Sequence, residues 1–350
     1  MENGVAYINK DLCDKSHRLY NSRNAEAAHL IDVEGNELHS WEYRQGGDWH
    51  YVEMLDNGHL LAICKDCMLI ELDWDSELVW KFETNAHHDF ARKEDGNTYI
   101  VSGRPNSRCE ALAPDRPLYL DNILEVTPAG EVVWQWYPEE HIEEMERFVE
   151  LVDSLRFWDD WPHLNTCEVL PDSPTARKDS RFAPGNLLVC GRHIDTIAVV
   201  ARQTGEVMWA WGSGELQGPH MPTMLPNGNI LIYDNGSNWA SDTRGKTHIL
   251  ELDPITEEIV WTYKERGGYT FFSSSRGSSE RLPNGNIYIA ESNSGRLFEV
   301  TRDGELVWEF LNPDRDDKGY RVPIYRSTHC LRETVSRLLS GAAAGGGGSA

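Results

Sequence analysis

Four histidines occupy one position relative to the turn that follows them. Three of them lie eight residues before a turn glycine, and the fourth lies at the same place before a turn that an insertion interrupts: His50, His88, His220 and His163. An imidazole changes its charge near neutral pH and can act as a nucleophile, a general base or a metal ligand. With only 13 histidines in 350 residues, this recurrence favours a functional cluster over four unrelated packing residues.

Two of the strand-like phrases that follow these turns end in arginine. VSGR ends at Arg104, and VCGR ends at Arg192. A guanidinium group matches the oxygen geometry of sulfate or phosphate, so an arginine beside clustered histidines indicates binding of a tetrahedral anion. A surface ion pair is the alternative for Arg104. Arg192 precedes His193 and shares a repeat unit with His163 and Asn165, which favours a role in the site.

One repeat unit has no histidine at the shared position. Counting eight residues back from Gly285 leads to Gly277, in the phrase SSSRGSSERLPNGN. This glycine is flanked by serines and by Arg276, which adds a second candidate for anion binding.

These positions belong to a repeat that also contains a tryptophan phrase. The phrase recurs six times, from NELHSWEY to GELVWEF, and its tryptophans are Trp41, Trp80, Trp134, Trp209, Trp261 and Trp308. Before most copies lie a second strand phrase, such as ILEL, and an earlier turn and strand, such as PNGNILIY. Four strands in about 40 to 50 residues is the signature of a β-propeller blade, so six phrases predict six blades. Equivalent positions on the innermost strands then converge on one channel.

The two ends of the chain are predicted to meet in one blade. Only two candidate strands, GVAYI and AAHLIDV, precede the first tryptophan phrase, so the innermost strand of that blade is missing at the N-terminus. The segment YRVPIYRSTHCLRE, residues 320–333, supplies it in this interpretation and adds His329 to the histidine set. Such pairing removes an exposed sheet edge. The predicted fold is therefore all-β, a six-bladed β-propeller closed by its N- and C-terminal strands.

The propeller is predicted to fill residues 1–338 as a single domain. Pro138 begins a stretch of acidic and apolar residues at helical spacing, which predicts a short helical insertion over about 138–155. Residues 339–350 end in GAAAGGGGSA and resemble a linker or tag, so we exclude them from the fold.

The charge of the chain argues against several classes of partner. The formal net charge is −24, which repels phosphate backbones and anionic lipids, so we expect neither nucleic acid nor a membrane as partner. No apolar run approaches the roughly 18 residues of a transmembrane helix, and the N-terminus shows no signal peptide. Seven cysteines without a disulfide-framework spacing favour reduced thiols. We expect a cytoplasmic protein that acts on a small molecule, and its oligomeric state is not predicted.

Four segments resemble the bacterial arylsulfotransferase family, whose members transfer sulfuryl groups between phenols without the donor PAPS. They are HHDF (87–90), WPHLNT (161–166), CGRH (190–193) and GPHMP (218–222). The resemblance implies a six-bladed propeller, an aromatic small-molecule substrate, a sulfated histidine intermediate and no cofactor. It agrees with the blade count that the tryptophan phrases give independently.

The resemblance also implies a role for each matching residue. His220 looks like the nucleophile, and His88 looks like the general acid or base. His163 and Asn165 look like the pair that holds the sulfuryl oxygens, and Arg192 looks like the arginine that neutralises them.

Three features depart from the family pattern or match it incompletely. His87, beside His88, is the less favoured of the two for proton transfer. A family hydroxyl that helps to bind sulfate has two candidates here, Ser275 and Ser278. His50 and His329 have no place in the pattern.

Two other functions stay open at this point. Several imidazoles around one channel suit a divalent transition metal such as Fe(II), Zn(II) or Mn(II), so the second hypothesis is a metal-dependent lyase or oxygenase. Its ligands would come from a set of five histidines: His50, His88, His163, His220 and His329. The third hypothesis is a non-catalytic propeller that binds a protein or a small ligand, because a fold alone does not fix a function.

Overall fold

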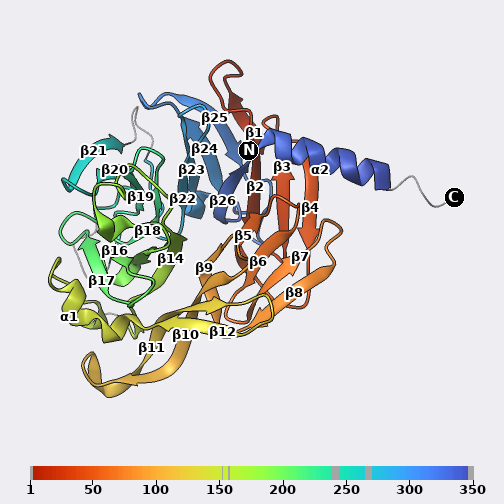
Figure 1. Ribbon diagram of the computed structural model, residues 1–350. Helices are drawn as coiled ribbons and strands as arrows, with labels where there is room; N and C mark the ends of the chain where they lie inside the picture. The colour runs from red at the N-terminus through yellow and green to blue at the C-terminus, as the bar shows by residue number, and fades with distance from the viewer. Residues whose placement is uncertain (1–2, 152, 157, 239–243, 265–269, 346–350) are drawn as a thin grey trace. The chain divides into compact units, whose positions relative to one another are not determined.

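The described strands form six sheets, each built around four antiparallel strands (Figure 1). A computed structural model describes residues 3–151, 153–156, 158–238, 244–264 and 270–345. Within these residues the α-helices are α1 (Ile142–Met145) and α2 (Arg332–Gly345), and neither is long and apolar enough to cross a membrane. Strands adjacent in sequence pair with each other in each sheet, as in propeller blades, so the predicted six-bladed all-β fold is confirmed.

The chain divides into two compact units, residues 1–82 with 280–350 and residues 83–279. The sheets of the first unit have the strand orders β26-β2-β3-β4, β5-β6-β7-β8 and β1-β25-β24-β23-β22. Their strands are β1 (Gly4–Ile8), β2 (His17–Ser22), β3 (Ala27–Ile31), β4 (Glu37–Glu42), β5 (Trp49–Met54), β6 (Leu60–Cys64), β7 (Met68–Leu72), β8 (Leu78–Glu83), β22 (Ser278–Arg281), β23 (Ile287–Glu291), β24 (Arg296–Val300), β25 (Leu306–Leu311) and β26 (Ile324–Cys330).

The predicted pairing of the two chain ends is present in the first unit. β26 lies at the edge of its sheet and pairs with β2 in antiparallel register, with Tyr20 opposite Ser327. The segment near the C-terminus therefore supplies the innermost strand of the first blade, as predicted.

The assignment of GVAYI to that first blade is wrong. These residues form β1, which pairs with β25 as a fifth strand of another sheet. The second strand of the first blade is instead β2, with the sequence HRLYNS. Its residues are all buried, but Arg18 and Asn21 interrupt the apolar pattern by which strands were recognised.

Arg18 forms a fully buried ion pair that makes β2 possible. Its Nη2 donates to Glu299 Oε2 at 2.8 Å, and both side chains are 0% exposed. The guanidinium also lies over the ring of Tyr288, 4.7 Å from the centroid. A buried charge that loses its partner is strongly destabilising, so Arg18 and Glu299 depend on each other.

We expect Arg18→Met to lower the free energy of unfolding by about 3 to 5 kcal/mol, because it leaves the Glu299 carboxylate buried without its partner. Urea unfolding followed by circular dichroism measures this loss. The double variant Arg18→Met/Glu299→Gln is expected to recover at least half of the lost free energy of unfolding, since it no longer buries an unpaired carboxylate. A double variant no more stable than Arg18→Met would show that charge pairing is not the cause.

The second unit, residues 83–279, contains the other three sheets. Their orders are β12-β11-β10-β9, with β13 also paired to β11, then β14-β15-β16-β17 and β18-β19-β20-β21. The strands are β9 (Ala86–Arg92), β10 (Thr98–Cys109), β11 (Ala113–Val126), β12 (Val132–Trp136), β13 (Asp160–Trp161), β14 (Leu164–Val169), β15 (Leu187–Gly191), β16 (Thr196–Val200), β17 (Val207–Trp211), β18 (Pro219–Met224), β19 (Ile230–Asp234), β20 (His248–Asp253) and β21 (Glu258–Tyr263).

The six tryptophan phrases form the fourth strands of the blades: β4, β8, β12, β17, β21 and β25. Trp41, Trp209 and Trp308 are fully buried, which fits the packing role expected of this position. All seven cysteines lie in the described part of the chain, and none of them is in a disulfide.

The predicted short helical insertion is present, but it is not one continuous helix over residues 138–155. The insertion contains the 3-10 turn Pro138–Glu140, the four-residue α1 and a second 3-10 turn at Ser154–Arg156, while residue 152 lies outside the described residues. Glutamates four residues apart repel each other on a helix, which disfavours a longer one. Two of them bind the sheets instead, because Glu139 pairs with Arg104 and Glu144 accepts the amide of Val207 at 2.7 Å.

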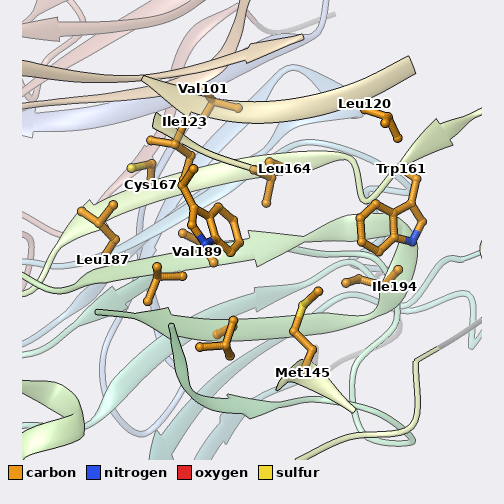
Figure 2. Packing of buried hydrophobic residues seen from close by; sticks show 14 of the residues in the cluster. Val101, Leu120, Ile123, Met145, Trp161, Leu164, Cys167, Leu187, Val189 and Ile194 are labelled. Carbon is orange, nitrogen blue, oxygen red and sulfur yellow. The ribbon is translucent and has the colours of Figure 1, made fainter. Parts of the chain in front are cut away.

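A single apolar cluster joins the insertion to the first two sheets of the second unit. Figure 2 shows Met145 of α1 in this cluster, and Trp161 beside Leu120 and Ile194. Trp161 and Met145 are each 3% exposed. Because Trp161 is anchored in this way, the backbone that leads to His163 is fixed in place.

Helix α2 extends into the range that the sequence analysis assigned to a tail. It continues through residues 339–345, and residues 346–350 lie outside the described residues. Val335 is fully buried in the core cluster of the first unit, and Arg337 donates to the carbonyl of Asp56 at 2.6 Å. The helix is therefore anchored at its start, and the alanines that follow favour its continuation.

Candidate functional site

Three neighbouring strands of the second unit, β9, β14 and β18, are the first strands of their blades (Figure 1). Side chains link each strand to the next. The amide of Cys167 on β14 donates to Asp89 Oδ2 on β9 at 2.8 Å. The side-chain nitrogen of Asn165 on β14 donates to the carbonyl of Pro219 on β18, also at 2.8 Å. These bonds hold the three strands side by side.

Each of these strands brings one histidine of the predicted cluster to a corresponding position. His88 is the third residue of β9, His163 immediately precedes β14, and His220 is the second residue of β18. The pairing register of each strand is irregular at or next to this position. His88 and His163 also have left-handed backbones, with φ of 60° and 61°. Bulges and positive φ at non-glycine residues redirect side chains and concentrate at functional sites.

A continuous series of rings connects two of these strands. The ring of His88 lies 4.8 Å from that of His87 and 4.7 Å from that of His163, measured between centroids. His163 stacks on His193 with centroids 4.3 Å apart, and His193 also stacks on Trp158 at 4.6 Å. The structure thus brings His193 into the cluster with His88 and His163.

Two aspartates, which were not among the predicted site residues, contact these histidines. Asp121 Oδ1 lies 3.0 Å from Nε2 of His87, an ion-pair distance without the alignment of a hydrogen bond. Burial raises the pKa of Asp121, although His87 opposes the shift. Asp160 accepts a hydrogen bond from Nδ1 of His163. Burial acts to raise the pKa of Asp160, but His163 and the other histidines outweigh it and lower the pKa to about 2. Asp160 is therefore an anion at neutral pH.

His193 is held as a neutral, buried imidazole. It is 2% exposed, and its Nδ1 donates to the backbone carbonyl of Asp160 at 2.9 Å. Burial, followed by repulsion from a charged His163, lowers the pKa of His193 to about 3. The ring therefore packs and stacks in the site without a charge of its own near neutral pH.

The buried state of His193 is expected to make the protein less stable in mild acid. Below the unfolded-state pKa of 6.5, the unfolded chain binds a proton at His193, whereas the folded chain binds it only near pH 3. As the pH decreases below 6.5, the contribution of His193 to the free energy of unfolding therefore decreases by about 1.4 kcal/mol per pH unit. The total loss at pH 5 is about 2 kcal/mol. Urea unfolding at pH 7.5 and pH 5 measures it, with His193→Gln as the comparison. Identical pH dependence of both proteins would contradict this assignment.

His220 is buried among polar groups of its own and the next loop. It is 2% exposed, and its Nδ1 lies 2.6 Å from Asn235 Oδ1 and 3.1 Å from the Gly218 carbonyl. Its Nε2 accepts the backbone N–H of Arg276 at 3.2 Å. Both ring nitrogens therefore face defined partners, and the ring has one fixed orientation.

Arg192 approaches the same two segments as His220. Its Nη2 donates to the carbonyl of Ser274 at 3.3 Å, and its Nε lies 3.8 Å from where a Cβ on Gly218 would be. The residue is 7% exposed, and the Nε atom is buried without a hydrogen-bond partner among the described residues. Burial lowers the pKa of Arg192, and Asp195 and Asp160 partly compensate. A buried donor without a protein partner suits an anionic ligand.

The segment with Ser275 and Arg276 covers His220, but through its backbone. Arg276 has a left-handed backbone with φ of 61°, and its N–H faces the His220 ring. The hydroxyl of Ser273 donates a hydrogen bond to the carbonyl of Ser275 at 2.9 Å. Gly277 follows with φ of 105°, and a Cβ there would lie 2.4 Å from the ring of Tyr233. The close contact explains why this unit has glycine where others have histidine.

Two of the predicted binding residues, Arg104 and Asn165, contact other groups of the protein. Arg104 pairs with Glu139 and lies over the ring of Tyr137, 4.5 Å from its centroid, so the ion-pair alternative describes it. Asn165 is fully buried, and its side chain holds β18 through Pro219 while its Oδ1 accepts the hydroxyl of Thr166. It therefore positions the strand that carries the nucleophile candidate.

His50 and His329 belong to the first unit. His50 stacks on Tyr325 with centroids 4.5 Å apart. His329 lies near the C-terminal end of β26, whereas the histidines of β9, β14 and β18 lie near the starts of their strands. Its Nδ1 pairs with Glu280 at 2.9 Å. His329 of the five-histidine metal set, which has no following turn to set its count, therefore does not share the strand position of the other histidines.

One group among the described residues has ligand atoms close enough for a metal ion: Asp160, His163 and His193, all within 4.8 Å of one another. An imidazole binds a metal near its own ring plane, at about 2.0 to 2.1 Å for zinc. The rings of His163 and His193 are only 27° from parallel and 4.3 Å apart, so a shared metal would lie well out of at least one plane. Joint coordination therefore requires one ring to rotate.

Three solved structures of similar fold are distant in sequence from this chain. A protein of unknown function from Bacteroides caccae aligns with a TM-score of 0.59 and 16% identity, covering 91% of this chain and all of that one. A streptogramin B lyase aligns with a TM-score of 0.52 and 10% identity, over 94% and 93% of the two chains. The WD40 propeller domain of Doa1 aligns with a TM-score of 0.51 and 12% identity, over 95% and 99%. These likenesses support the propeller fold alone.

The sequence itself matches one family model. The model describes the arylsulfotransferases (ASST), and the match runs from residue 51 to residue 313, more than half of the chain. No curated protein matches the sequence significantly. The matched range contains the ring series of His87, His88, His163 and His193 as well as His220 and Arg192.

Proposed function

The chain belongs to the arylsulfotransferase family, and from this premise we propose that it transfers a sulfuryl group from an aryl sulfate to a phenolic acceptor through a sulfated His220. A proton on Nδ1 leaves Nε2 of His220 with the lone pair that a nucleophile needs.

In the first half-reaction, the lone pair of Nε2 attacks the sulfur of the aryl sulfate. The N–S bond forms, and the S–O bond to the aryl ring breaks, so the phenolate leaves with the electron pair. The ring of His220 retains its Nδ1 proton and gains a positive charge that the attached sulfonate balances. Fixed donors aimed at the equatorial oxygens stabilise the negative charge of this transition state, and Arg192 is the donor that we assign.

In the second half-reaction, His88 takes the proton of the acceptor phenol. The phenol oxygen then attacks the sulfur, and the N–S bond breaks with its electron pair returning to Nε2. His88 can pass the proton to the departing phenolate of the first half-reaction or to water. His163 is the neighbour of His88 in the ring series and, with Asp160 ionised beside it, keeps a defined orientation.

One observation supports this proposal most strongly. A buried imidazole with defined partners on both nitrogens approaches two segments, around Gly218 and Ser274–Arg276. A buried guanidinium nitrogen of Arg192, which has no hydrogen-bond partner among the described residues, approaches the same two segments. A nucleophile and an unused anion donor at one place are what sulfuryl transfer requires.

The test is a transfer assay with para-nitrophenyl sulfate as donor and excess phenol as acceptor. We expect release of nitrophenol together with equimolar phenyl sulfate, and a chelator should have no effect. Without acceptor, mass spectrometry at alkaline pH should find one sulfuryl group on the peptide that contains His220. Failure to release nitrophenol from any of several aryl sulfates would count against the proposal. Turnover that depends on an added transition metal would favour the metal hypothesis instead.

A further inference from the structure

We propose that Asn235 is a positioning residue that determines which nitrogen of His220 is reactive. The inference rests on the proposed function of His220 for its catalytic consequence, whereas the arrangement itself is independent of the reaction. Asn235 immediately follows β19, is fully buried, and was not singled out by the sequence.

The orientation of the Asn235 amide follows from its backbone partners. One side-chain atom lies 2.7 Å from the carbonyl of Ser273 and 2.8 Å from the carbonyl of Arg276. Carbonyl oxygens only accept hydrogen bonds, so this atom must be the NH2 group that donates to both. The other atom, Oδ1, is then an acceptor and faces His220.

This orientation fixes the tautomer of His220. Its Nδ1 faces two acceptors, Asn235 Oδ1 at 2.6 Å and the Gly218 carbonyl at 3.1 Å, so Nδ1 carries the hydrogen. On the other side, the N–H of Arg276 donates to Nε2 at 3.2 Å, which requires a lone pair there. All three partners therefore select the neutral ring with its lone pair on Nε2.

Asn235 also holds the segment that covers Nε2. Its two donated bonds fix the carbonyls of Ser273 and Arg276, and the N–H of Arg276 is the group that faces the ring. One side chain thus sets the tautomer on one edge of the imidazole and the backbone donor on the other. When Nε2 carries a sulfuryl group, that N–H is placed to donate to a sulfuryl oxygen instead.

The choice of asparagine over aspartate has a chemical consequence. A carboxylate beside Nδ1 would stabilise the charged imidazolium and raise its pKa, which removes the lone pair at neutral pH. A neutral amide accepts the same hydrogen bond without this effect. The residue type therefore suits a nucleophile that must stay unprotonated.

Histidine nitrogen NMR tests the inference directly. In protein labelled with 15N-histidine, the signals of His220 are identified by their loss in His220→Gln. We expect the Nδ1–H tautomer in the wild type, and a mixture of tautomers in Asn235→Ala. A wild-type ring protonated at Nε2, or an unchanged tautomer in Asn235→Ala, would overturn the inference whether or not the protein transfers sulfuryl groups.

The pH dependence of transfer separates positioning from general structural support. For Asn235→Asp we expect the acidic limb of kcat/KM to move to higher pH, with partial activity retained above it. For Asn235→Ala we expect a loss on the order of a hundredfold in kcat, with KM little changed. An unshifted profile in Asn235→Asp would contradict the inference. If the NMR result is as expected but no aryl sulfate reacts, the positioning of His220 stands and the proposed function fails.

Asn312→Ala is the matched control. Asn312 is also fully buried, donates to the Val322 carbonyl and the Ser22 hydroxyl, and accepts a hydrogen bond from the amide of Asp314. Its hydrogen bonds among the described residues include none to a histidine. Its loss is expected to lower stability without changing the His220 tautomer or the pH profile. A change in either would show that the effects of Asn235 are those of any buried asparagine.

Discussion

Replacing His220 by glutamine is expected to reduce the turnover of para-nitrophenyl sulfate by at least about a thousandfold, because the nucleophile is lost and cannot be supplied by a neighbour. Glutamine is of similar size and polar, so the buried pocket between Asn235 and the Arg276 backbone stays filled. The sulfuryl adduct on this peptide should disappear with the activity. Initial rates of nitrophenol release and intact mass spectrometry measure the two effects.

Two comparisons make this result specific. His39→Gln removes another largely enclosed ring, which stacks on Trp74 with centroids 3.8 Å apart, and is expected to leave turnover unchanged. His220→Gly leaves a space for added imidazole, which is expected to restore part of the turnover. A His220→Gln enzyme that keeps more than a tenth of the wild-type rate would refute the assignment of the nucleophile.

Arg192→Met is expected to separate activity from stability. Removing one fixed donor from a site for a developing anion costs on the order of a hundredfold to a thousandfold in kcat, so turnover should fall by that amount. Stability should not fall, because the wild-type chain buries a guanidinium with an unpartnered Nε, and methionine fills similar space without a charge. We expect the free energy of unfolding to stay the same or to rise by about 1 kcal/mol.

The control for Arg192 is a structural arginine in the same unit. Arg202 pairs with Glu125, whose side chain is 2% exposed, and donates to the hydroxyl of Tyr99 at 2.6 Å. Arg202→Met is expected to lose stability and to keep its turnover per folded molecule. Inorganic sulfate should raise the melting temperature of the wild type and of Arg202→Met, but not of Arg192→Met. An Arg192→Met protein that is less stable and fully active would mean that Arg192 supports the fold only.

Repetition explains how much of this site could be predicted from the sequence. A histidine that stands at a constant distance from a turn occupies an equivalent place in each blade, so His88, His163 and His220 were identified without coordinates. The same reasoning failed for His329, because no turn follows it to set the count, and the structure places it near the other end of its strand.

Residues outside the repeated phrases were harder to predict. Asp121 lies within the long strand β11, and its partner His87 was the less favoured histidine of a pair. Asn235 is the third residue of YDNG, the phrase that corresponds to VCGR in another blade, but its role depends on carbonyls of a later loop. Contacts of that kind are set by tertiary structure and leave no pattern in the chain.

The helical insertion shows a different limit. Apolar spacing and a leading proline predicted a helix over 138–155, but the acidic side chains there bind the sheets and the described helix is only Ile142–Met145. Local periodicity competes with specific tertiary partners, and here Glu139 and Glu144 are held by their partners.

The pairing of β26 with β2 has a consequence for how the protein is made. Residues 17–22 leave the ribosome well before their partner at 324–330 is synthesised. The inner edge of β2 therefore keeps unpaired backbone groups until residues 324–330 have been translated, and an open edge of this kind can pair with other chains. Among the six described sheets, the one that contains β2 is thus the last completed, and a nascent chain halted before residue 324 is released with that edge open.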